Sequence, residues 1–262
     1  MAAARQMSTG AGARVTLVRI ALVATLLVTW EAVSASGWLF RDVVPSLAAI
    51  GTAIFRLLGN RDFYANLGVT VGEIGVALAI GGFTGLATGI VLGANRFLSD
   101  AFESMLLYLG PTPKIIFFPV MIMWFGVGTG SKIAMGAISC FFPIAISTAA
   151  GMREIDRVLI RVGRSFRASP WQMVTKIYLP AMRAPILNGV RLGLGVAVIG
   201  TLLAETKLSN RGLGYLVIQA YSLFDMPRMY ALLIVLFVLA IGANVLVGRL
   251  VGTASTAART MR

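Results

Sequence analysis

The sequence offers few residue types that could carry out covalent chemistry. It contains no histidine and a single cysteine, Cys140, which excludes a histidine-based metal site, a Ser-His-Asp triad and a disulfide within the chain. No Gly-x-x-x-x-Gly-Lys-Ser/Thr motif occurs, so the chain has no phosphate-binding loop for ATP. No cluster of cysteines or paired carboxylates in the sequence supports a membrane-embedded enzyme either. We therefore expect a protein that is not an enzyme and that binds no metal ion or cofactor itself.

A second kind of chemistry is binding by charged residues inside long apolar stretches. Lys114 follows Pro111 and Pro113 within such a stretch. A charged side chain is costly in a membrane, and a proline breaks the hydrogen bonds of a helix. Lipid satisfies neither, so both residues are tolerated where a segment is buried or lines a cavity. The alternative is that Lys114 reaches the membrane surface or pairs with Glu73 or Glu103. The candidates for a solute pathway, which include two residues of a later apolar stretch, are Pro111, Pro113, Lys114, Arg191 and Glu205.

Composition defines the elements that must position these residues. Hydrophobic residues make up 58% of the 262 residues and charged residues only 13%, about half of what soluble domains carry. Such a chain cannot cover a globule with polar surface, and it is too hydrophobic to be disordered. The formal net charge of +13 comes from residues that gather between apolar runs, which is typical of cytoplasmic loops rather than of a nucleic-acid-binding surface. We predict an all-α membrane protein with several spans and no nucleic-acid partner.

Runs of about 20 apolar residues are long enough to cross a bilayer as helices. Residues 46–59 have helical periodicity but are too short to cross, so we expect an interfacial helix there. Cleavage of a signal-like segment within residues 1–35 is a minor alternative to a first span. The six predicted spans, which form a membrane domain of residues 15–250 between tails 1–14 and 251–262, are about 15–34, 67–92, 101–125, 133–151, 185–205 and 229–250.

The second predicted span contains a regular stripe of glycines. They recur every four residues, so they lie along one face of a helix. Because glycine has no side chain beyond a hydrogen, a neighbouring helix can approach closely along that face. We expect helix packing, and not phosphate binding, at Gly81, Gly85, Gly89 and Gly93.

An even number of spans places both termini on the same side of the membrane. If that side is the cytoplasm, fourteen lysines and arginines lie in inside segments and seven in outside segments, with Lys114 and Arg191 in the spans. The outside group includes Lys132, in a predicted tight turn of residues 126–132. Positive residues are enriched in cytoplasmic loops, so this bias favours the orientation. The only long polar stretch, residues 152–183, is then a cytoplasmic loop.

This loop has the capping signals of two short helices. Asp156 can cap a helix over residues 157–168, and Ser169 can cap a second over residues 170–178, with Pro170 at its first position. Their apolar residues would form a surface that either binds a partner protein or packs on lipid headgroups, and the residues alone leave both open. The apolar residues expected to be exposed are Val158, Phe166, Trp171, Met173, Val174 and Tyr178.

The spacing of residues within the loop carries a resemblance to a known family. Ile177–Tyr178–Leu179–Pro180 ends the loop, and Arg167 lies ten residues before Ile177 and six after Arg161. This spacing resembles the EAA loop of permease subunits of binding-protein-dependent ABC importers, in which Glu-Ala-Ala, three residues, Gly and nine residues precede Ile-x-Leu-Pro. Here Arg161–Val162–Gly163 stands in place of Glu-Ala-Ala, and Arg167 in place of the Gly. An arginine at a turn with positive φ would be strained by about 1 kcal/mol.

Other stretches resemble the sulfonate, taurine and nitrate branch of the same family. The resemblance covers about residues 15–250. The stretches that carry it are Ile122–Gly128, Phe141–Pro143, Leu159–Ile160, Arg164–Trp171 and Gly212–Tyr215.

The resemblance implies an inner-membrane subunit of six spans, with both termini in the cytoplasm, that works by alternating access. A separate ATPase subunit would bind ATP and Mg²⁺. A periplasmic or lipid-anchored solute-binding protein would deliver the solute, and two copies of this chain would enclose the pathway in the lipid bilayer. The residues implied to couple to the ATPase are Arg161, Gly163, Arg164, Phe166, Arg167, Trp171, Val174, Ile177, Leu179 and Pro180.

The substrate that the resemblance implies is a small organic anion such as a sulfonate or taurine, or nitrate. Lys114 and Arg191 could supply positive potential along its path. Close relatives also carry thiamine precursors, so a permease for such a solute, or for another small organic solute, is an alternative. A stand-alone secondary transporter is an alternative from another class. Such a transporter would require carboxylates within the membrane for proton or sodium coupling and would usually have internal repeats.

Overall fold

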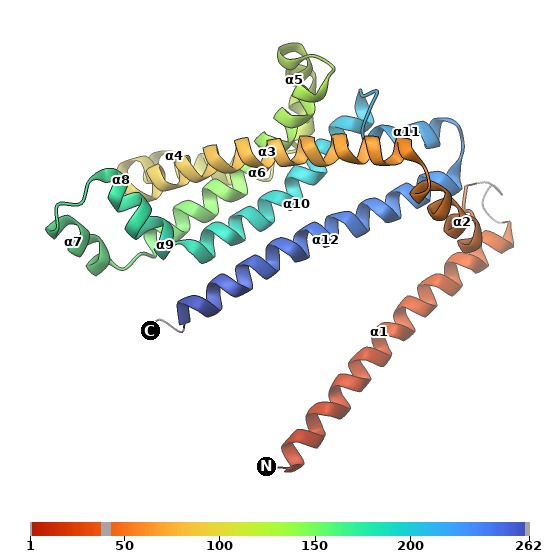
Figure 1. The fold of residues 1–262 in the computed structure, drawn as a ribbon, viewed down its shortest axis with the longest axis horizontal. Helices are drawn as coiled ribbons and strands as arrows, with labels where there is room; N and C mark the ends of the chain where they lie inside the picture. The colour runs from red at the N-terminus through yellow and green to blue at the C-terminus, as the bar shows by residue number, and fades with distance from the viewer. Residues whose placement is uncertain (1, 38–42, 260–262) are drawn as a thin grey trace. The chain divides into compact units, whose positions relative to one another are not determined.

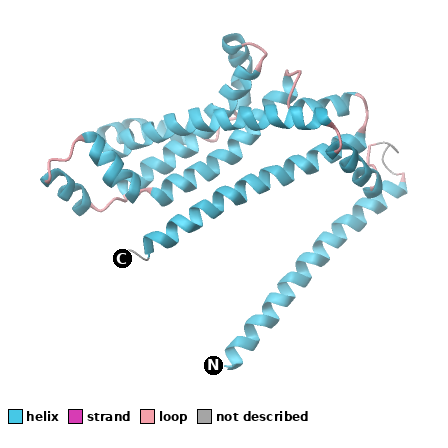
Figure 2. Ribbon diagram, in the orientation of Figure 1, coloured by secondary structure: helices cyan, strands magenta, loops and turns pink. Residues whose placement is uncertain are grey.

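A computed structural model describes residues 2–37 and 43–259, and this part of the chain is helical without a strand (Figures 1 and 2). Besides the long helices named below, one further segment is long and apolar enough to cross a membrane, but it is a bent pair of helices. The all-α membrane fold is thus confirmed. Within the described residues, five helices contain stretches long and apolar enough to cross a membrane: α1 (Ala2–Ser36), α3 (Arg61–Ala94), α6 (Thr129–Arg153), α10 (Arg183–Lys207) and α12 (Met226–Arg259).

The bent pair lies in the third predicted span. Helix α4 (Arg96–Leu109) ends at Gly110, and the chain resumes as a 3₁₀ turn, η1 (Lys114–Phe117), followed by α5 (Phe118–Phe125). The two parts are bent by 92°. Pro111 and Pro113 occupy the break, because a proline cannot donate a backbone hydrogen bond to continue the helix. The interruption expected from the prolines is therefore present.

The tight turn predicted over residues 126–132 is wrong in its second half. Helix α6 begins at Thr129, so Lys132 lies in its first turn and not in an outside loop. The side chain is only 1% exposed and donates hydrogen bonds to the backbone oxygens of Val127 and Gly128. The predicted tails 1–14 and 251–262 continue α1 and α12 as far as the structure describes them.

The chain divides into two compact units, one of residues 1–60 and 219–233 and the other of residues 61–218 and 234–262. In the first unit, the expected short helix is present as α2 (Leu47–Leu58), with Ser46 as its N-cap. Glu31 accepts a hydrogen bond from the backbone nitrogen of Leu47 at 2.9 Å, so a side chain of α1 caps the same helix end. The first unit is thus held partly by polar contacts to the start of α2.

The core of the second unit is formed by α3, α6 and α10, which lie side by side (Figure 1). The glycine stripe of α3 faces α6. A Cβ atom added at any of these glycines would fall 2.4–2.8 Å from an atom of α6, far inside van der Waals contact. The stripe therefore sets how closely the two helices approach, as expected for a small-residue interface in a membrane. The glycines are Gly81, Gly85, Gly89 and Gly93.

The first prediction tests this close approach. Gly89→Ala should lower the free energy of unfolding by about 1–3 kcal/mol, because its Cβ would lie 2.5 Å from Thr148 Cβ and 2.6 Å from the backbone oxygen of Ala145. Cys140, the single cysteine, is 0% exposed, so a thiol-reactive fluorescent dye reports unfolding on heating. The control is Gly75→Ala on the same helix, where no atom lies within 4 Å of the added Cβ. Equal unfolding midpoints for the two variants would refute the packing role.

Candidate functional site

The loop between α6 and α10, which we predict to lie in the cytoplasm, folds as two short helical segments. Helix α7 (Arg157–Ser165) is capped by Asp156, which accepts a hydrogen bond from the Val158 nitrogen at 2.7 Å. The second segment runs through α8 (Pro170–Gln172), a π-helical turn η2 (Met173–Tyr178) and α9 (Leu179–Ala181). Ser169 and Gln172 form a reciprocal capping box at its start. Both predicted caps are confirmed, although the first helix ends three residues earlier than expected.

Arg167 makes the turn between the two segments. Its φ is +51°, in the left-handed region that favours glycine. The chain turns here because the Arg167 nitrogen donates to the backbone oxygen of Arg164 at 2.9 Å and the Ala168 nitrogen donates to that of Gly163 at 3.1 Å. The position at which the resembled loop has glycine therefore does adopt a positive φ in this chain. The arginine keeps the turn at the cost of local strain.

The two segments pack on each other and on the ends of the spans. Gly163 is buried, and a Cβ there would lie 2.3 Å from Ile177 Cδ1 and 2.7 Å from Met173 Sδ. Met173 is 7% exposed, so the expectation that it is exposed is wrong: it fills the space beside Gly163. Ile160 and Tyr178 pack on an apolar cluster that also contains Met182. The loop is thus a packed unit seated where α6 ends and α10 begins (Figure 1).

The outer surface of this loop exposes both aromatic residues and arginines. Phe166 is 83% exposed and Trp171 is 74% exposed, whereas Val174 is half-buried. Among the described residues, Arg161, Arg164 and Arg167 form no ion pair. The remaining predicted coupling residues lie at the same surface or beneath it: Arg161, Arg164, Arg167 and Pro180 are exposed, and Ile177 and Leu179 are half-buried.

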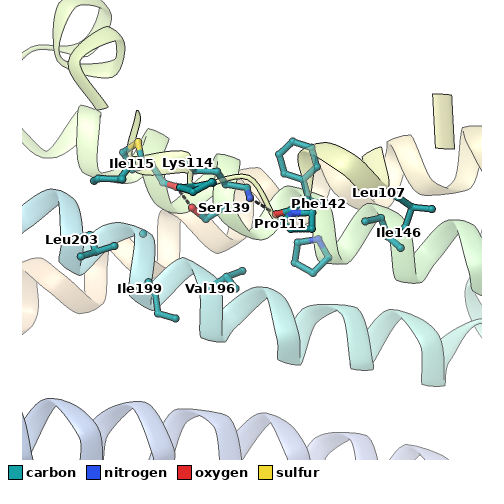
Figure 3. Close-up of a pocket in the computed structure, with 15 residues that line it drawn as sticks. Leu107, Pro111, Lys114, Ile115, Ser139, Phe142, Ile146, Val196, Ile199 and Leu203 are labelled. Atoms are coloured by element: carbon teal, nitrogen blue, oxygen red, sulfur yellow. Dashed lines mark hydrogen bonds between the residues drawn. The ribbon is translucent and has the colours of Figure 1, made fainter. Parts of the chain in front are cut away.

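The break in the third span opens onto a cavity of about 630 Å³ (Figure 3). Helices α4, α6 and α10 form its wall, and Pro111, Pro113 and Lys114 line it. The Lys114 ammonium donates hydrogen bonds to the backbone oxygens of Gly110 and, at 3.2 Å, Thr112. It also lies 4.9 Å from the centre of the Phe142 ring, within range of a cation–π interaction. The carbonyls freed by the broken helix and the aromatic face therefore hold the lysine inside the membrane segment.

The other two pathway candidates lie away from this cavity. The Arg191 Nε donates to Asn244 Oδ1 at 2.7 Å and so links α10 to α12. Glu205 is 0% exposed and lies near the opposite end of α10 from the loop. Glu103, one considered partner of Lys114, instead forms a salt bridge with Arg153. The structure therefore brings together Pro111, Pro113 and Lys114 but neither Arg191 nor Glu205 with them.

Glu205 belongs to a buried polar cluster that fastens the start of helix α11 (Leu213–Ser222). Its Oε2 accepts a hydrogen bond from the Gly214 nitrogen at 2.6 Å, and its Oε1 accepts one from Thr70 Oγ1 at 2.7 Å. Thr70 Oγ1 in turn accepts from the Leu213 nitrogen at 2.8 Å. The first backbone N–H groups of a helix have no partner within it, so these side chains satisfy groups that would otherwise be orphaned. Gly212, with φ +104°, turns the chain against the Glu205 carboxyl group.

Sequence reasoning missed this cluster as a unit. Glu73 is 4% exposed and lies beside Glu205, and one of its oxygens has no hydrogen-bond partner among the described residues. Lys132 interacts with both carboxyl groups. The stretch Gly212–Leu213–Gly214 at the start of a helix could have indicated the cluster. The backbone N–H groups at a helix start require acceptors from elsewhere in the chain.

The fold and these sites define a class of protein. Long apolar helices, a broken span that lines a cavity, and a packed loop between spans with exposed aromatic residues describe a membrane-embedded transport subunit. The chain belongs to the family of binding-protein-dependent transport system inner membrane components, whose sequence profile matches residues 81–253.

Individual relatives agree with this assignment. The chain is 28% identical to a putative aliphatic sulfonates transport permease of Bacillus subtilis, over 82% of this chain and 78% of the relative. It is 28% identical to the taurine transport system permease of Escherichia coli (88% and 87%) and 31% identical to a riboflavin transport system permease of Chloroflexus aurantiacus (86% and 84%).

A solved structure shares the fold. The inward-facing MetNI methionine ABC transporter contains a chain that matches with a TM-score of 0.65, at 21% sequence identity, over 73% of this chain and 95% of that one. The resemblance to importer permeases inferred from the loop and neighbouring stretches is therefore confirmed.

Proposed function

We propose that two copies of this chain form the translocation pathway of an ABC importer for a small organic anion. A separate ATPase, which binds ATP and Mg²⁺, docks on the loop, and a periplasmic or lipid-anchored binding protein delivers the solute. The observation that carries the proposal is the exposed apolar surface of Phe166 and Trp171 on a packed cytoplasmic loop. Large exposed aromatic residues on a rigid element are typical of a protein–protein contact.

A continuous path of contacts joins this loop to the cavity. The loop packs on the end of α6, where the Arg153 guanidinium forms a two-pronged salt bridge with Glu103 of α4. Helix α4 then leads to the break at Gly110 and to Lys114. A movement of the loop by the ATPase would therefore be passed to the helices that line the cavity, as alternating access requires.

The dimer is supported by α5. This helix is bent away from α4, and Met123 and Trp124 on it are 84% and 72% exposed. A single chain of six spans is also too small to enclose a pathway. A second copy would cover this projecting apolar helix and complete the wall around the cavity.

The substrate class follows from the cavity and from the relatives together. Two relatives are named for aliphatic sulfonates and for taurine, solutes that share an anionic sulfonate group, and Lys114 is the charged residue that lines the cavity. A relative named for riboflavin is equally similar, so similarity alone does not select the solute. Reconstitution tests the proposal: liposomes with this chain, its ATPase and its binding protein should take up labelled taurine or butane-1-sulfonate only with ATP. Uptake without ATP would favour a secondary transporter instead.

The second prediction concerns topology. Reporter fusions after Arg262 and at Arg167 should both report the cytoplasm, and a fusion at Arg61 should report the outside, because most of the positive residues lie in the segments assigned inside. Paired alkaline phosphatase and green fluorescent protein fusions measure this. A C-terminus outside the cytoplasm would contradict both the orientation and the position of the loop.

The third prediction concerns the strained turn. Arg167→Val should weaken binding of the ATPase about tenfold, because a β-branched residue is strongly disfavoured at a φ of +51° and the loop would leave its binding conformation. Arg167→Gly removes the same side chain, but glycine tolerates the positive φ of the turn. The affinity of this variant for the ATPase should stay within about threefold of that of the unaltered chain. Affinity is measured on the chain in nanodiscs. Equal loss in both variants would show that the arginine itself, and not the turn, makes the contact.

A further inference from the structure

The cavity at the break of the third span combines the positive charge of Lys114 with an apolar wall. We infer that it is a contact site for an organic anion with a short alkyl portion, whose charged group binds Lys114 and whose alkyl portion lies on the apolar wall. This inference rests on the proposed function, because it names the solute that the pathway would accept.

The first argument is that Lys114 has capacity left for an anion. An ammonium group has three N–H donors, and here two are used on the backbone oxygens of Gly110 and Thr112. No carboxylate of the described residues pairs with it: Glu103 is bound to Arg153 instead. A cation held within a span without a counterion favours an anionic ligand.

The second argument is that the rest of the wall suits a carbon chain. Apart from Lys114, the wall is formed almost entirely by apolar side chains, including Ile146, Val196, Ile199 and Leu203 (Figure 3). Ser139 is the exception, but its hydroxyl donates to the Met135 oxygen of its own helix at 2.7 Å. The site therefore offers one cationic donor and an apolar surface. Nitrate would use only the first of these features.

The third argument is depth, which separates a solute from a lipid. Ser139 lies 10 residues from the start of α6 and 14 from its end, so about 15 Å and 21 Å of helix separate it from the two ends. Val196 of α10 is similarly placed, 13 residues from Arg183 and 11 from Lys207. The cavity is thus near the middle of the bilayer, where a lipid headgroup does not reside and where transporters bind their solutes.

The test uses protection of an introduced thiol in the full-length chain in nanodiscs. Ile199→Cys places a thiol on the cavity wall, at a residue that is 58% exposed, while the natural Cys140 is 0% exposed and leaves the parent chain unlabelled. The probes are nitrate, methanesulfonate and butane-1-sulfonate. We expect the sulfonates to slow maleimide labelling, with a half-protecting concentration that falls about two- to fourfold per methylene. Nitrate should give no protection in the same concentration range.

Two further substitutions examine the charged group. Adding Lys114→Met should raise the half-protecting concentration at least about tenfold, whereas Lys114→Arg, which keeps the charge, should change it less. Arg96→Met serves as the control, because Arg96 is an exposed cation that does not line the cavity. The same Lys114 and Arg96 substitutions are also made without Ile199→Cys, so that heating with the thiol-reactive dye reports exposure of Cys140 and verifies that each is folded.

Each other outcome overturns the inference in an identifiable way. Equal protection by nitrate and butane-1-sulfonate would remove the alkyl requirement, and protection only by added lysophospholipid would make the cavity a lipid site. No labelling at Ile199→Cys or at Leu203→Cys would show that water does not reach the cavity. If ATP-driven uptake is intact while protection is absent, the inference fails and the proposed function stands. If uptake requires no ATPase, the proposed function fails instead.

Discussion

Glu205→Ala is expected to lower the free energy of unfolding by about 3 kcal/mol, one of the two largest effects we predict. The alanine would leave the Gly214 nitrogen and the Thr70 hydroxyl without their acceptor in a site with no access to water. It would also remove a carboxyl group that interacts with the buried Lys132. Unpartnered polar groups in such surroundings cost far more than a lost surface contact.

The measurement is the unfolding midpoint from labelling of Cys140 on heating. For a chain of this size the loss corresponds to a fall of roughly 6–12 °C. Glu205→Gln keeps an oxygen acceptor in a side chain of the same shape. Its unfolding midpoint should therefore fall by about a third as much as that of Glu205→Ala. Glu154→Ala, at an exposed position, should leave the midpoint unchanged. A Glu205→Ala midpoint close to that of the unaltered chain would show that the cluster does not fasten the start of α11.

Features set by local sequence could be predicted well. The apolar runs predicted the long helices because about 20 apolar residues have few alternatives to a span. The prolines at 111 and 113 predicted the break, and Asp156 and Ser169 predicted helix starts, because capping and helix breaking depend on neighbours within a few residues. The turn at Arg167 was expected from the resemblance, which has glycine at this position, and the structure shows the positive φ there.

Features set by contacts between distant residues could not be predicted. Thr70 and Glu205 are 135 residues apart in sequence, and nothing near either residue indicates the other. Lys132 was placed in a loop because glycines precede it, but helix α6 begins at Thr129 and packing of the helices leaves the side chain only 1% exposed. Met173 was expected at the surface of its short helix. The sequence around it does not show that Gly163, on the neighbouring helix, leaves space for its side chain. Each error concerns a side chain that is buried by packing between helices.

The other large effect is expected at the surface of the loop. Phe166→Ala should weaken binding of the ATPase about 30-fold, or about 2 kcal/mol, because a well-exposed aromatic residue that becomes buried on binding is a typical anchor. Trp171→Ala should have an effect of similar size, and Val174→Ala a smaller one because Val174 is already half-buried. Binding of the purified ATPase to the chain in nanodiscs measures each affinity.

The arginines around this surface provide the matched control. Arg164 is exposed and carries a charge at the rim, so Arg164→Ala should change the affinity less than about threefold while slowing association and reducing its dependence on salt. Arg161 should behave in the same way, since charges at a rim steer encounter more than they hold a complex. Cysteines placed at positions 160–175 should crosslink to the ATPase. If no position crosslinks in an intact complex and Phe166→Ala binds normally, the loop lies on lipid and another segment holds the ATPase.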